Sequence, residues 1–256
     1  MSGWKLSVKE TEATKQKAVP SGSIPNGKAA AIPVPRGTYR LPEADDTVPA
    51  PAPGGTNYRL IKRAFDIVFS LVMTLLGIIP VAVICLAIRL ESPGNPLFAQ
   101  ERVGLNGKII HIFKLRTMVQ DAHEHPEHYL NHEQLDQWKR EQKVDGDPRI
   151  TKVGSFLRRT SLDEVPQFFN VLKGDLSVIG PRPVTMRETY EYGEARNLIL
   201  SVKPGITGWW QVTERNNATW ESGQRQALEV FYARHASLAM DARIFVRTFK
   251  AMGKGN

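Results

Sequence analysis

The distribution of apolar residues separates the chain into three parts, and the first part is polar throughout. Residues 1–57 are rich in Pro, Gly, Ser, Ala and Lys and show little apolar periodicity. Such a segment cannot bury enough surface to offset the entropy of ordering it, so we expect a disordered N-terminal arm. Its start also lacks the apolar centre and the small-residue cleavage site of a signal peptide.

The second part, residues 58–92, contains an apolar run from Ile67 to Ile88 without a charged residue. The run is long enough to cross a bilayer as a straight helix. Pro80, near its middle, removes a backbone hydrogen bond and kinks a helix. The positive-inside tendency favours a cytoplasmic position for both ends, because basic residues flank both: Arg59, Lys62, Arg63 and Arg89. We therefore expect a re-entrant membrane helix broken at Pro80. The alternative is an ordinary spanning helix with a proline kink.

The third part, residues 93–256, changes to short elements. Residues 97–100 and 109–113 read as strands joined across a Gly-containing loop at 104–107. Helical patterns cover a polar insertion at 119–144 and the segments 187–201 and 220–235. The expected fold class is α/β of the mixed α+β kind, mainly helical, with one small domain following the membrane helix.

The last expected helix, from Asp241 to about residue 252, has two different faces. Arg243, Arg247 and Lys250 fall on one stripe at helical spacing, and Ile244 and Phe249 fall on the other. This pattern suits an amphipathic helix at a membrane surface, with its cations toward lipid phosphates. A surface helix packed on the domain core is the alternative.

Composition narrows the classes of partner. The 256-residue chain has a formal net charge of +8 and a pI of about 9.6, which points to polyanions: nucleic acid, phosphorylated substrates or an anionic membrane. The single cysteine, Cys85, excludes an intrachain disulfide. His123, His125, His128 and His132 cluster in the polar insertion, where a solvated face is expected rather than a zinc site.

The segment from Arg158 to Pro183, RRTSLDEVPQFFNVLKGDLSVIGPRP, gathers most of the charged chemistry. Asp163 and Glu164 stand side by side where an apolar helix should begin. One interpretation is structural, with Ser161 as N-cap and Glu164 reaching back in a capping box; with Asp163 as N-cap instead, Pro166 fits the first turn. A helix start also presents N–H groups to a phosphate, and a carboxylate there can attack phosphorus or hold Mg²⁺.

Basic residues that could meet a phosphorylated ligand lie on both sides of the carboxylates. Arg158 precedes the pair closely enough to compensate two adjacent negative charges. Lys114 and Arg116 alternate along the predicted strand, so both should point to one face, where they could clamp a diphosphate.

Arg182 stands between Pro181 and Pro183, so its backbone is nearly fixed. A preorganised arginine loses less entropy when it binds a phosphate. A purely structural loop is the alternative at this position.

Together, these motifs resemble those of the bacterial sugar transferases, the monotopic polyprenyl-phosphate phosphoglycosyl transferases. The resemblance runs from about Lys62 to Met252. It rests on the order and combination of six pieces: residues 62–66 (KRAFD), 113–118 (FKLRTM), 147–151 (DPRIT), 163–164 (DE), 180–183 (GPRP) and 203–209 (KPGITGW).

The resemblance implies an activity and roles for individual residues. Such an enzyme transfers a sugar 1-phosphate from a UDP-sugar to a polyprenyl (undecaprenyl) phosphate and releases UMP, as the first membrane step of exopolysaccharide or other glycoconjugate assembly. Asp163 matches the nucleophile, which forms an aspartyl-phosphosugar intermediate, and also a Mg²⁺ ligand. Glu164 matches its partner in the second step. Arg158 matches an active-site arginine, and Lys114, Arg116 and the 181–183 motif are expected to bind substrate.

The resemblance also implies a place in the cell and a set of partners. The chain should lie at the bacterial inner membrane, with its catalytic domain, residues 93–256, on the cytoplasmic face. The implied partners are a UDP-sugar, a polyprenyl phosphate and anionic lipids; no nucleic acid is expected, and a homo-oligomer is left open. The chain departs from the family pattern at Ile79, where Ser usually precedes the proline, and at Glu214, where Gly is common.

Two functions of other classes compete with this interpretation. A non-catalytic basic membrane scaffold for polysaccharide assembly would keep the apolar helix and the basic faces, but would need no Asp163–Glu164 pair beside phosphate-binding arginines. A nucleic-acid-binding protein would fit the high pI, but the sequence carries no recognised nucleic-acid motif and does contain a long apolar run.

Overall fold

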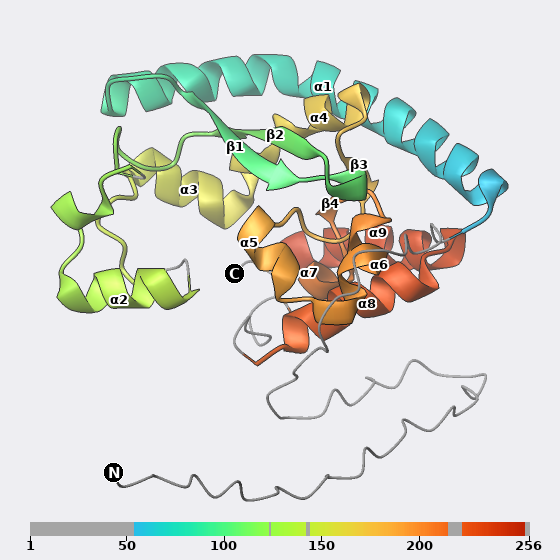
Figure 1. Ribbon diagram of the computed structural model, residues 1–256. Helices are drawn as coiled ribbons and strands as arrows, with labels where there is room; N and C mark the ends of the chain where they lie inside the picture. Colours follow the sequence, from blue (N-terminus) through green and yellow to red (C-terminus); the bar gives the residue numbers. More distant parts are fainter. Residues whose placement is uncertain (1–53, 123, 142–143, 215–221, 254–256) are drawn as a thin grey trace, which may run out of the picture. The chain divides into compact units, whose positions relative to one another are not determined.

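The computed structural model describes residues 54–253 apart from 123, 142–143 and 215–221 (Figure 1). Most of the expected N-terminal arm, residues 1–53, lies outside the described residues. The first element, α1 (Thr56–Glu91), begins two residues before the predicted start of the membrane segment.

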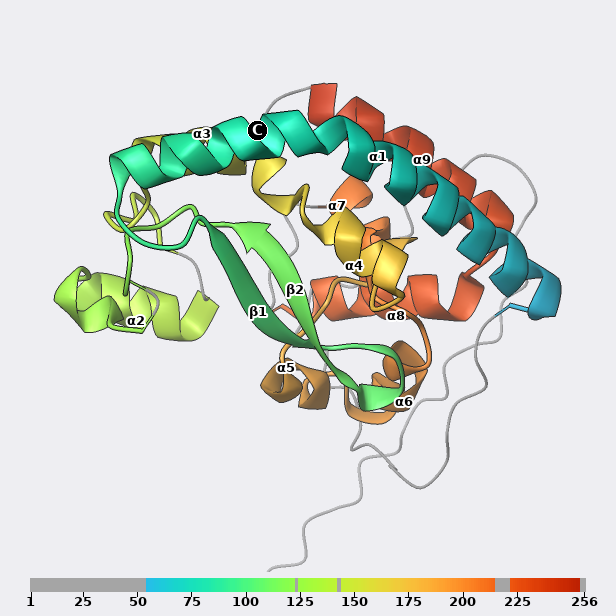
Figure 2. The same cartoon turned by 90° about the horizontal axis from the view of Figure 1, so that it is seen from above.

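The apolar run forms one continuous helix that passes through Pro80 without a break. At ~1.5 Å per residue its 36 residues measure about 54 Å, more than the ~30 Å hydrocarbon thickness of a bilayer. Figures 1 and 2 show α1 arching across the domain instead of running straight. The expected break is therefore a bend, since a proline removes only one helical hydrogen bond while the neighbouring turns continue.

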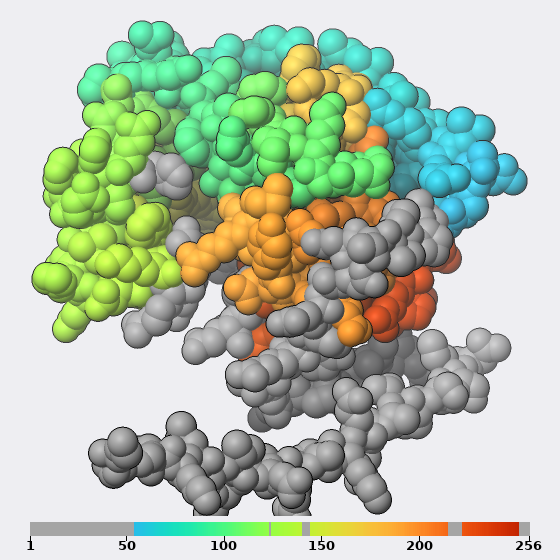
Figure 3. All heavy atoms as spheres, viewed as in Figure 1, coloured from blue at the N-terminus to red at the C-terminus, as the bar shows by residue number. Residues whose placement is uncertain are grey.

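Many of the apolar side chains of α1 are exposed in the described structure. Leu76 is 67% exposed and Ile79 is 75% exposed. In the part of the chain that the structure describes, α1 is the one helix long and apolar enough to cross a membrane. Figure 3 shows it along one edge of the domain, with the hairpin residues beneath it. An apolar surface of this extent needs a lipid or protein environment, which supports a membrane-associated helix.

The N-terminal half of α1 is joined to the domain by two buried carboxylates. Asp66 accepts hydrogen bonds from Ser177 Oγ at 3.0 Å and from the backbone N–H of Val178 at 2.9 Å. Asp241 accepts from Lys62 Nζ at 2.7 Å and from Tyr58 Oη at 3.0 Å. A buried carboxylate is tolerated only when it is paired in this way, so these contacts fix α1 on the domain.

The described part of the domain contains two small sheets. Strands β1 (Leu97–Val103) and β2 (Ile109–Leu115) form an antiparallel hairpin, which confirms the two predicted strands. Strands β3 (Ser177–Ile179) and β4 (Gly205–Thr207) pair in parallel.

Helices make up most of the rest of the described chain (Figure 2). The α-helices after α1 are α2 (His132–Glu141), α3 (Lys152–Thr160), α4 (Gln167–Lys173), α5 (Met186–Tyr190), α6 (Arg196–Leu200), α7 (Trp209–Thr213), α8 (Gln224–His235) and α9 (Leu238–Gly253). The 3-10 turns are η1 (Leu105–Gly107), η2 (Pro126–His128), η3 (Leu162–Glu164) and η4 (Gly193–Ala195).

Two predicted helices are shorter than the sequence pattern indicated. The segment 187–201 is divided into α5, η4 and α6, because Gly193 adopts a left-handed conformation with φ 51° and interrupts the helix. The polar insertion 119–144 is helical mainly in α2, and Pro126 starts the separate turn η2. The predicted helix at 220–235 corresponds to α8.

Helix α9 packs on the core, as the alternative interpretation of its sequence proposed. Ile244 is fully buried in the main hydrophobic cluster, together with Ile112, Val178 and Tyr232. Arg243 and Lys250 are exposed on the other side of the helix. Contact of these cations with lipid phosphates stays a prediction.

Strands β3 and β4 approach so closely that their glycines cannot carry side chains. A Cβ atom on Gly180 or on Gly205 would overlap the backbone of the facing segment. The N–H of Gly205 donates to the carbonyl of Pro181 at 2.8 Å. The 180–183 motif is therefore held firmly by the 203–209 segment, which explains why both carry glycine.

Candidate active site

Asp163 and Glu164 lie on the 3-10 turn η3, between the end of α3 and the start of α4. Neither predicted cap is present. Ser161 has φ 56°, ends α3 in the left-handed conformation and makes no side-chain cap bond, and Pro166 occupies the N-cap position of α4. Neither carboxylate therefore serves as the N-cap of α4.

The structure brings Lys114 and Arg158 to these carboxylates. Lys114 Nζ, at the end of β2, lies 3.0 Å from Glu164 Oε1. Arg158, in the last turn of α3, has a solvent-accessible side chain, and its charge acts on Asp163. Two cations thus face two acids, as the sequence predicted for this group of residues.

Burial and the neighbouring carboxylate of Glu164 raise the pKa of Asp163 to about 6, against the opposing effect of Lys114 and Arg158. Burial is the larger of the two causes, and the charges of Lys114 and Arg158 do not fully offset it. A displaced pKa of this kind is common at functional carboxylates.

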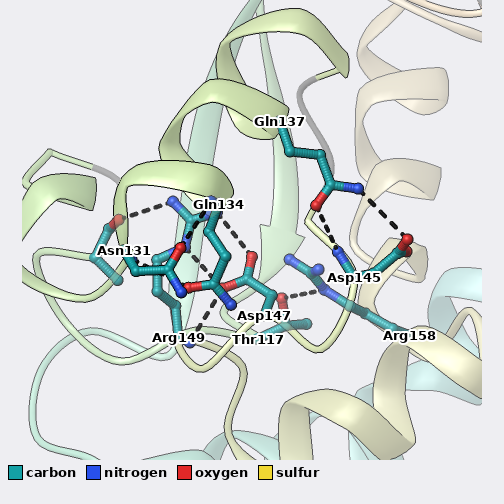
Figure 4. Close-up of polar contacts among 9 residues, drawn as sticks. Thr117, Asn131, Gln134, Gln137, Asp145, Asp147, Arg149 and Arg158 are labelled. Atoms are coloured by element: carbon teal, nitrogen blue, oxygen red, sulfur yellow. Dashed lines mark hydrogen bonds and ion pairs between the residues drawn. The ribbon is translucent and has the colours of Figure 1, made fainter.

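A support network holds Arg158 in place (Figure 4). The Nε atom of Arg158 donates to Thr117 Oγ1 at 2.9 Å. Beside it, Arg149 is almost fully buried and is held by Asp147 through Nε at 2.8 Å and Nη2 at 2.7 Å. The sequence drew attention to the 113–118 and 147–151 motifs but did not predict that they meet behind Arg158.

Arg116 does not join this group. Its guanidinium donates to the carbonyls of Ser92 at 2.7 Å and Pro93 at 2.6 Å, and so holds the chain as it leaves α1. Strand β2 ends at Leu115, so the alternation that was expected to align Arg116 with Lys114 does not extend to it. In the described contacts, Arg116 holds the backbone that follows α1 and does not stand beside Lys114 as the expected clamp for a diphosphate.

Arg182 lies in a second cluster of charged residues. Its backbone N–H contacts both carboxylate oxygens of Glu229 at 3.2 Å, and its guanidinium lies 5.8 Å from the centre of the Trp210 ring. Arg225 lies over the same ring at 4.3 Å. Burial raises the pKa of Glu229 to about 7, and the charge of Arg225 opposes this shift. Pro181 and Pro183 are both buried beside it.

Arg102, on the hairpin, lies near the Arg182 cluster. The charge of Arg182 acts on Arg102, and burial lowers the pKa of Arg102 to about 10. Arg102 pairs with Ile110 and Lys114 pairs with Phe98, so both cations project from the same face of the hairpin. Their backbones are about 13 Å apart at ~3.3 Å per residue. The sequence did not single out Arg102, Arg225 or Glu229, since each is isolated from any motif.

Two groups of residues could hold a metal ion. Asp163 and Glu164 offer carboxylate oxygens, the ligands that Mg²⁺ prefers. His125, Glu127 and His128 have ligand atoms within 4.8 Å of one another, but all three residues are exposed on η2, in agreement with the solvated face expected there.

Comparison with known proteins supports the family resemblance that the sequence motifs indicated. Residues 57–255 match the family model described as bacterial sugar transferase. The chain is 40% identical over 197 residues to the galactosyl transferase CpsE of Streptococcus agalactiae and 38% identical over 197 residues to the undecaprenyl-phosphate galactose phosphotransferase of Salmonella typhimurium. It is 34% identical over 195 residues to the exopolysaccharide production protein ExoY of Rhizobium meliloti.

The matches cover 77%, 76% and 75% of this chain, respectively. The chain spans about two-fifths of the length of the first two relatives, 43% and 40%, but 85% of the third. The matched region contains α1, the Asp163–Glu164 turn and the Arg182 cluster. The chain therefore belongs to the bacterial sugar transferase family.

Proposed function

We propose that this chain transfers a sugar 1-phosphate from a UDP-sugar to a polyprenyl phosphate and releases UMP. One observation carries the proposal: Asp163 and Glu164 lie on an accessible turn between two cations, Lys114 and Arg158, next to an apolar helix that suits a lipid environment. A relative is named for the undecaprenyl-phosphate galactose reaction and another for the corresponding glucose 1-phosphate reaction.

In the first step, a carboxylate oxygen of Asp163 attacks the β-phosphorus of the UDP-sugar. The bond between that phosphorus and the bridging oxygen breaks, and its electron pair leaves with UMP. The product on the protein is an acyl phosphate that carries the sugar. Arg158 and Lys114 stabilise the negative charge that spreads over the phosphoryl oxygens during the transfer.

In the second step, a phosphate oxygen of the polyprenyl phosphate attacks the same phosphorus. The bond between phosphorus and the Asp163 oxygen breaks, and the carboxylate is regenerated. Glu164 accepts a proton from the incoming phosphate if that phosphate arrives singly protonated. Because Lys114 forms an ion pair with Glu164, it also orients this carboxylate.

Asp163 and Glu164 would hold a Mg²⁺ ion together with the donor diphosphate. When bound, the ion supplies positive charge to the diphosphate and to the two carboxylates. The raised pKa of Asp163, caused first by burial and then by Glu164, supports this assignment, because a nearby cation favours the ionised form.

Arg102, Arg182 and Arg225 give the donor a second place to bind. We infer that Arg182 meets the donor at its nucleotide end when the β-phosphate lies at Asp163. Direct contact between Arg182 and the Asp163 turn is not required, because one ligand can meet both clusters.

The competing scaffold function does not need this arrangement. A scaffold has no use for an accessible carboxylate whose pKa burial and a second carboxylate raise. The nucleic-acid alternative is also disfavoured, since the family match includes the apolar helix. UMP release decides between the enzyme and the scaffold.

The full chain in phospholipid nanodiscs, incubated with UDP-sugars labelled in the sugar and without lipid acceptor, should become labelled on the peptide containing Asp163. Adding undecaprenyl phosphate should move the label to lipid. Excess EDTA should stop both steps, and Mg²⁺ should restore them, because the diphosphate needs charge compensation. Release of UMP only when lipid is present, with no labelled peptide, would support direct attack by the lipid phosphate. No UMP release with any UDP-sugar would favour the scaffold.

We further propose that α1 is re-entrant, with the catalytic domain on the cytoplasmic face of the inner membrane. In a Cys85→Ala background, Asn57→Cys and Asn95→Cys should both react only with a thiol reagent that reaches the cytoplasmic side. Pro80→Leu should straighten α1 and move position 57 to the opposite side. Labelling of Asn57→Cys from the periplasm in the otherwise unchanged chain would establish a spanning helix.

A further inference from the structure

The turn that carries Asp163 and Glu164 rests on the middle of α1. Leu162, the first residue of the turn, packs into the same apolar cluster as Val81, Ile84 and Ile88 of α1. A Cβ atom added to Gly77 would lie 3.1 Å from Cγ1 of Val165, the residue that follows Glu164. The absence of a side chain at Gly77 therefore lets the turn sit close against the helix.

The two ends of α1 hold the two helices that flank this turn. Near its C-terminal end, the Glu91 carboxylate accepts hydrogen bonds from the backbone N–H groups of Lys152 at 2.8 Å and Val153 at 2.9 Å. These are N–H groups in the first turn of α3, and α3 ends with Arg158.

Near its N-terminal end, α1 holds α4 through a cation that donates to carbonyl groups. Arg63 donates to the carbonyls of Val171 at 2.7 Å and Leu172 at 2.9 Å, in the last turn of α4. A carboxylate thus meets a helix N-terminus and a guanidinium meets a helix C-terminus. Both contacts satisfy backbone groups that a helix leaves unpaired, and both have the favourable sign for the helix dipole.

The spacing of Arg63, Gly77 and Glu91 allows one side of α1 to contact α4, the turn and α3. Arg63, Gly77 and Glu91 are separated by 14 residues in each interval, which is close to four helical turns, so all three lie on one face of α1. Each interval spans about 21 Å at ~1.5 Å per residue. Pro80 lies between Gly77 and Glu91, so the bend of α1 changes the direction of the end that holds α3 relative to the end that holds α4.

We propose that α1 is the template that sets the position of Arg158 relative to Asp163 and Glu164, and that Gly77 is a positioning residue for the reaction. This inference rests on the proposed function for its kinetic consequence, though not for its geometry. A helix that served only as an anchor would need the contacts at its ends, but would not need an open position beneath the catalytic turn.

The test is a compensating pair of substitutions in the full chain, reconstituted in phospholipid nanodiscs. Gly77→Val should push Val165 and the turn away from α1. We expect kcat to fall by roughly 10- to 100-fold, since displacement of a reacting group by about 1 Å can cost that much. The KM for the UDP-sugar should stay within about twofold, because the hairpin and Arg182 do not move. Adding Val165→Ala removes the obstructing methyl groups and should restore most of kcat.

Val83→Ile is the matched control, since it adds a methylene to α1 at a position that is 62% exposed. It should leave kcat, KM and nanodisc incorporation unchanged. Hydrogen exchange of the segment 158–173 gives a readout that does not depend on activity: protection should fall in Gly77→Val, recover in the double variant and stay unchanged in Val83→Ile.

Equal kcat in Gly77→Val and the unchanged chain, or a loss of kcat that Val165→Ala does not restore, would overturn the inference. If the unchanged chain shows no transfer, the proposed function fails, and hydrogen exchange alone decides whether α1 positions the turn. Unaltered protection of residues 158–173 in Gly77→Val would then show that Gly77 does not position the turn.

Discussion

Asp163→Asn is expected to abolish sugar-phosphate transfer and, at the same time, to stabilise the fold. Transfer should fall by roughly 10³-fold or more, because an amide cannot form the acyl phosphate. Burial and Glu164 raise the pKa of Asp163 to about 6, so the ionised carboxylate opposes folding at neutral pH. Removing that charge should raise the free energy of unfolding by about 1 to 3 kcal/mol at pH 7.

The gain in the free energy of unfolding of Asp163→Asn should depend on pH, because folding raises the pKa of Asp163. The folded protein holds the proton of Asp163 more tightly than the unfolded chain does, so the cost of ionising it develops as pH rises from about 4 to about 6. The melting temperature of Asp163→Asn should therefore exceed that of the unchanged protein at pH 7 and approach it near pH 4. Asp136→Asn, which changes an exposed carboxylate, is the matched control and should alter neither activity nor melting. A lower melting temperature for Asp163→Asn at pH 7 would contradict the assigned environment.

Arg158→Met should lower kcat by roughly 100- to 1,000-fold, the usual cost of removing one preorganised donor to a transferring group. Its Nε atom is held by Thr117 Oγ1 at 2.9 Å, which leaves the outer nitrogens of the guanidinium for a phosphoryl group. Arg158→Lys keeps the charge but loses the planar donor geometry, so it should recover only part of the rate. Steady-state UMP release measures these effects.

Arg159→Met is the matched control for this experiment, since Arg159 is the exposed neighbour in the same turn of α3. It should keep kcat within about twofold, as expected for a solvated surface residue. Equal losses in the Arg158 and Arg159 variants would indicate damage to α3 instead of a lost contact with substrate. Arg158→Met should also leave the melting temperature largely unchanged.

The sequence singled out residues that lie together in the structure, but it did not predict their local geometry; their roles stay predictions. Asp163, Glu164, Lys114 and Arg158 do come together, because the hairpin and the α3–α4 turn carry them to one place. The helix start expected at Asp163 was wrong. Ser161 adopts a left-handed conformation that serine rarely takes, and no local pattern announces it.

Other features depend on partners that are distant along the chain. Arg116 binds the carbonyls of Ser92 and Pro93, more than 20 positions earlier, so its role could not be read from its own strand. Arg102 comes from β1, and Arg225 and Glu229 come from α8; the charge of Arg182 acts on all three only in the folded domain. Periodicity describes one element at a time, and such clusters arise from the packing of several elements.

The two buried carboxylates that join α1 to the domain also constrain the order in which the protein is made. Asp66 and Lys62 leave the ribosome before their partners, Val178 and Asp241, have been synthesised. Because α1 is synthesised first, it can enter the lipid before the domain folds as a unit and then present Asp66 to its partners. A domain released without α1 would leave the N–H of Val178 and the carboxylate of Asp241 without these partners, and it should accumulate as aggregates in place of a soluble catalytic fragment.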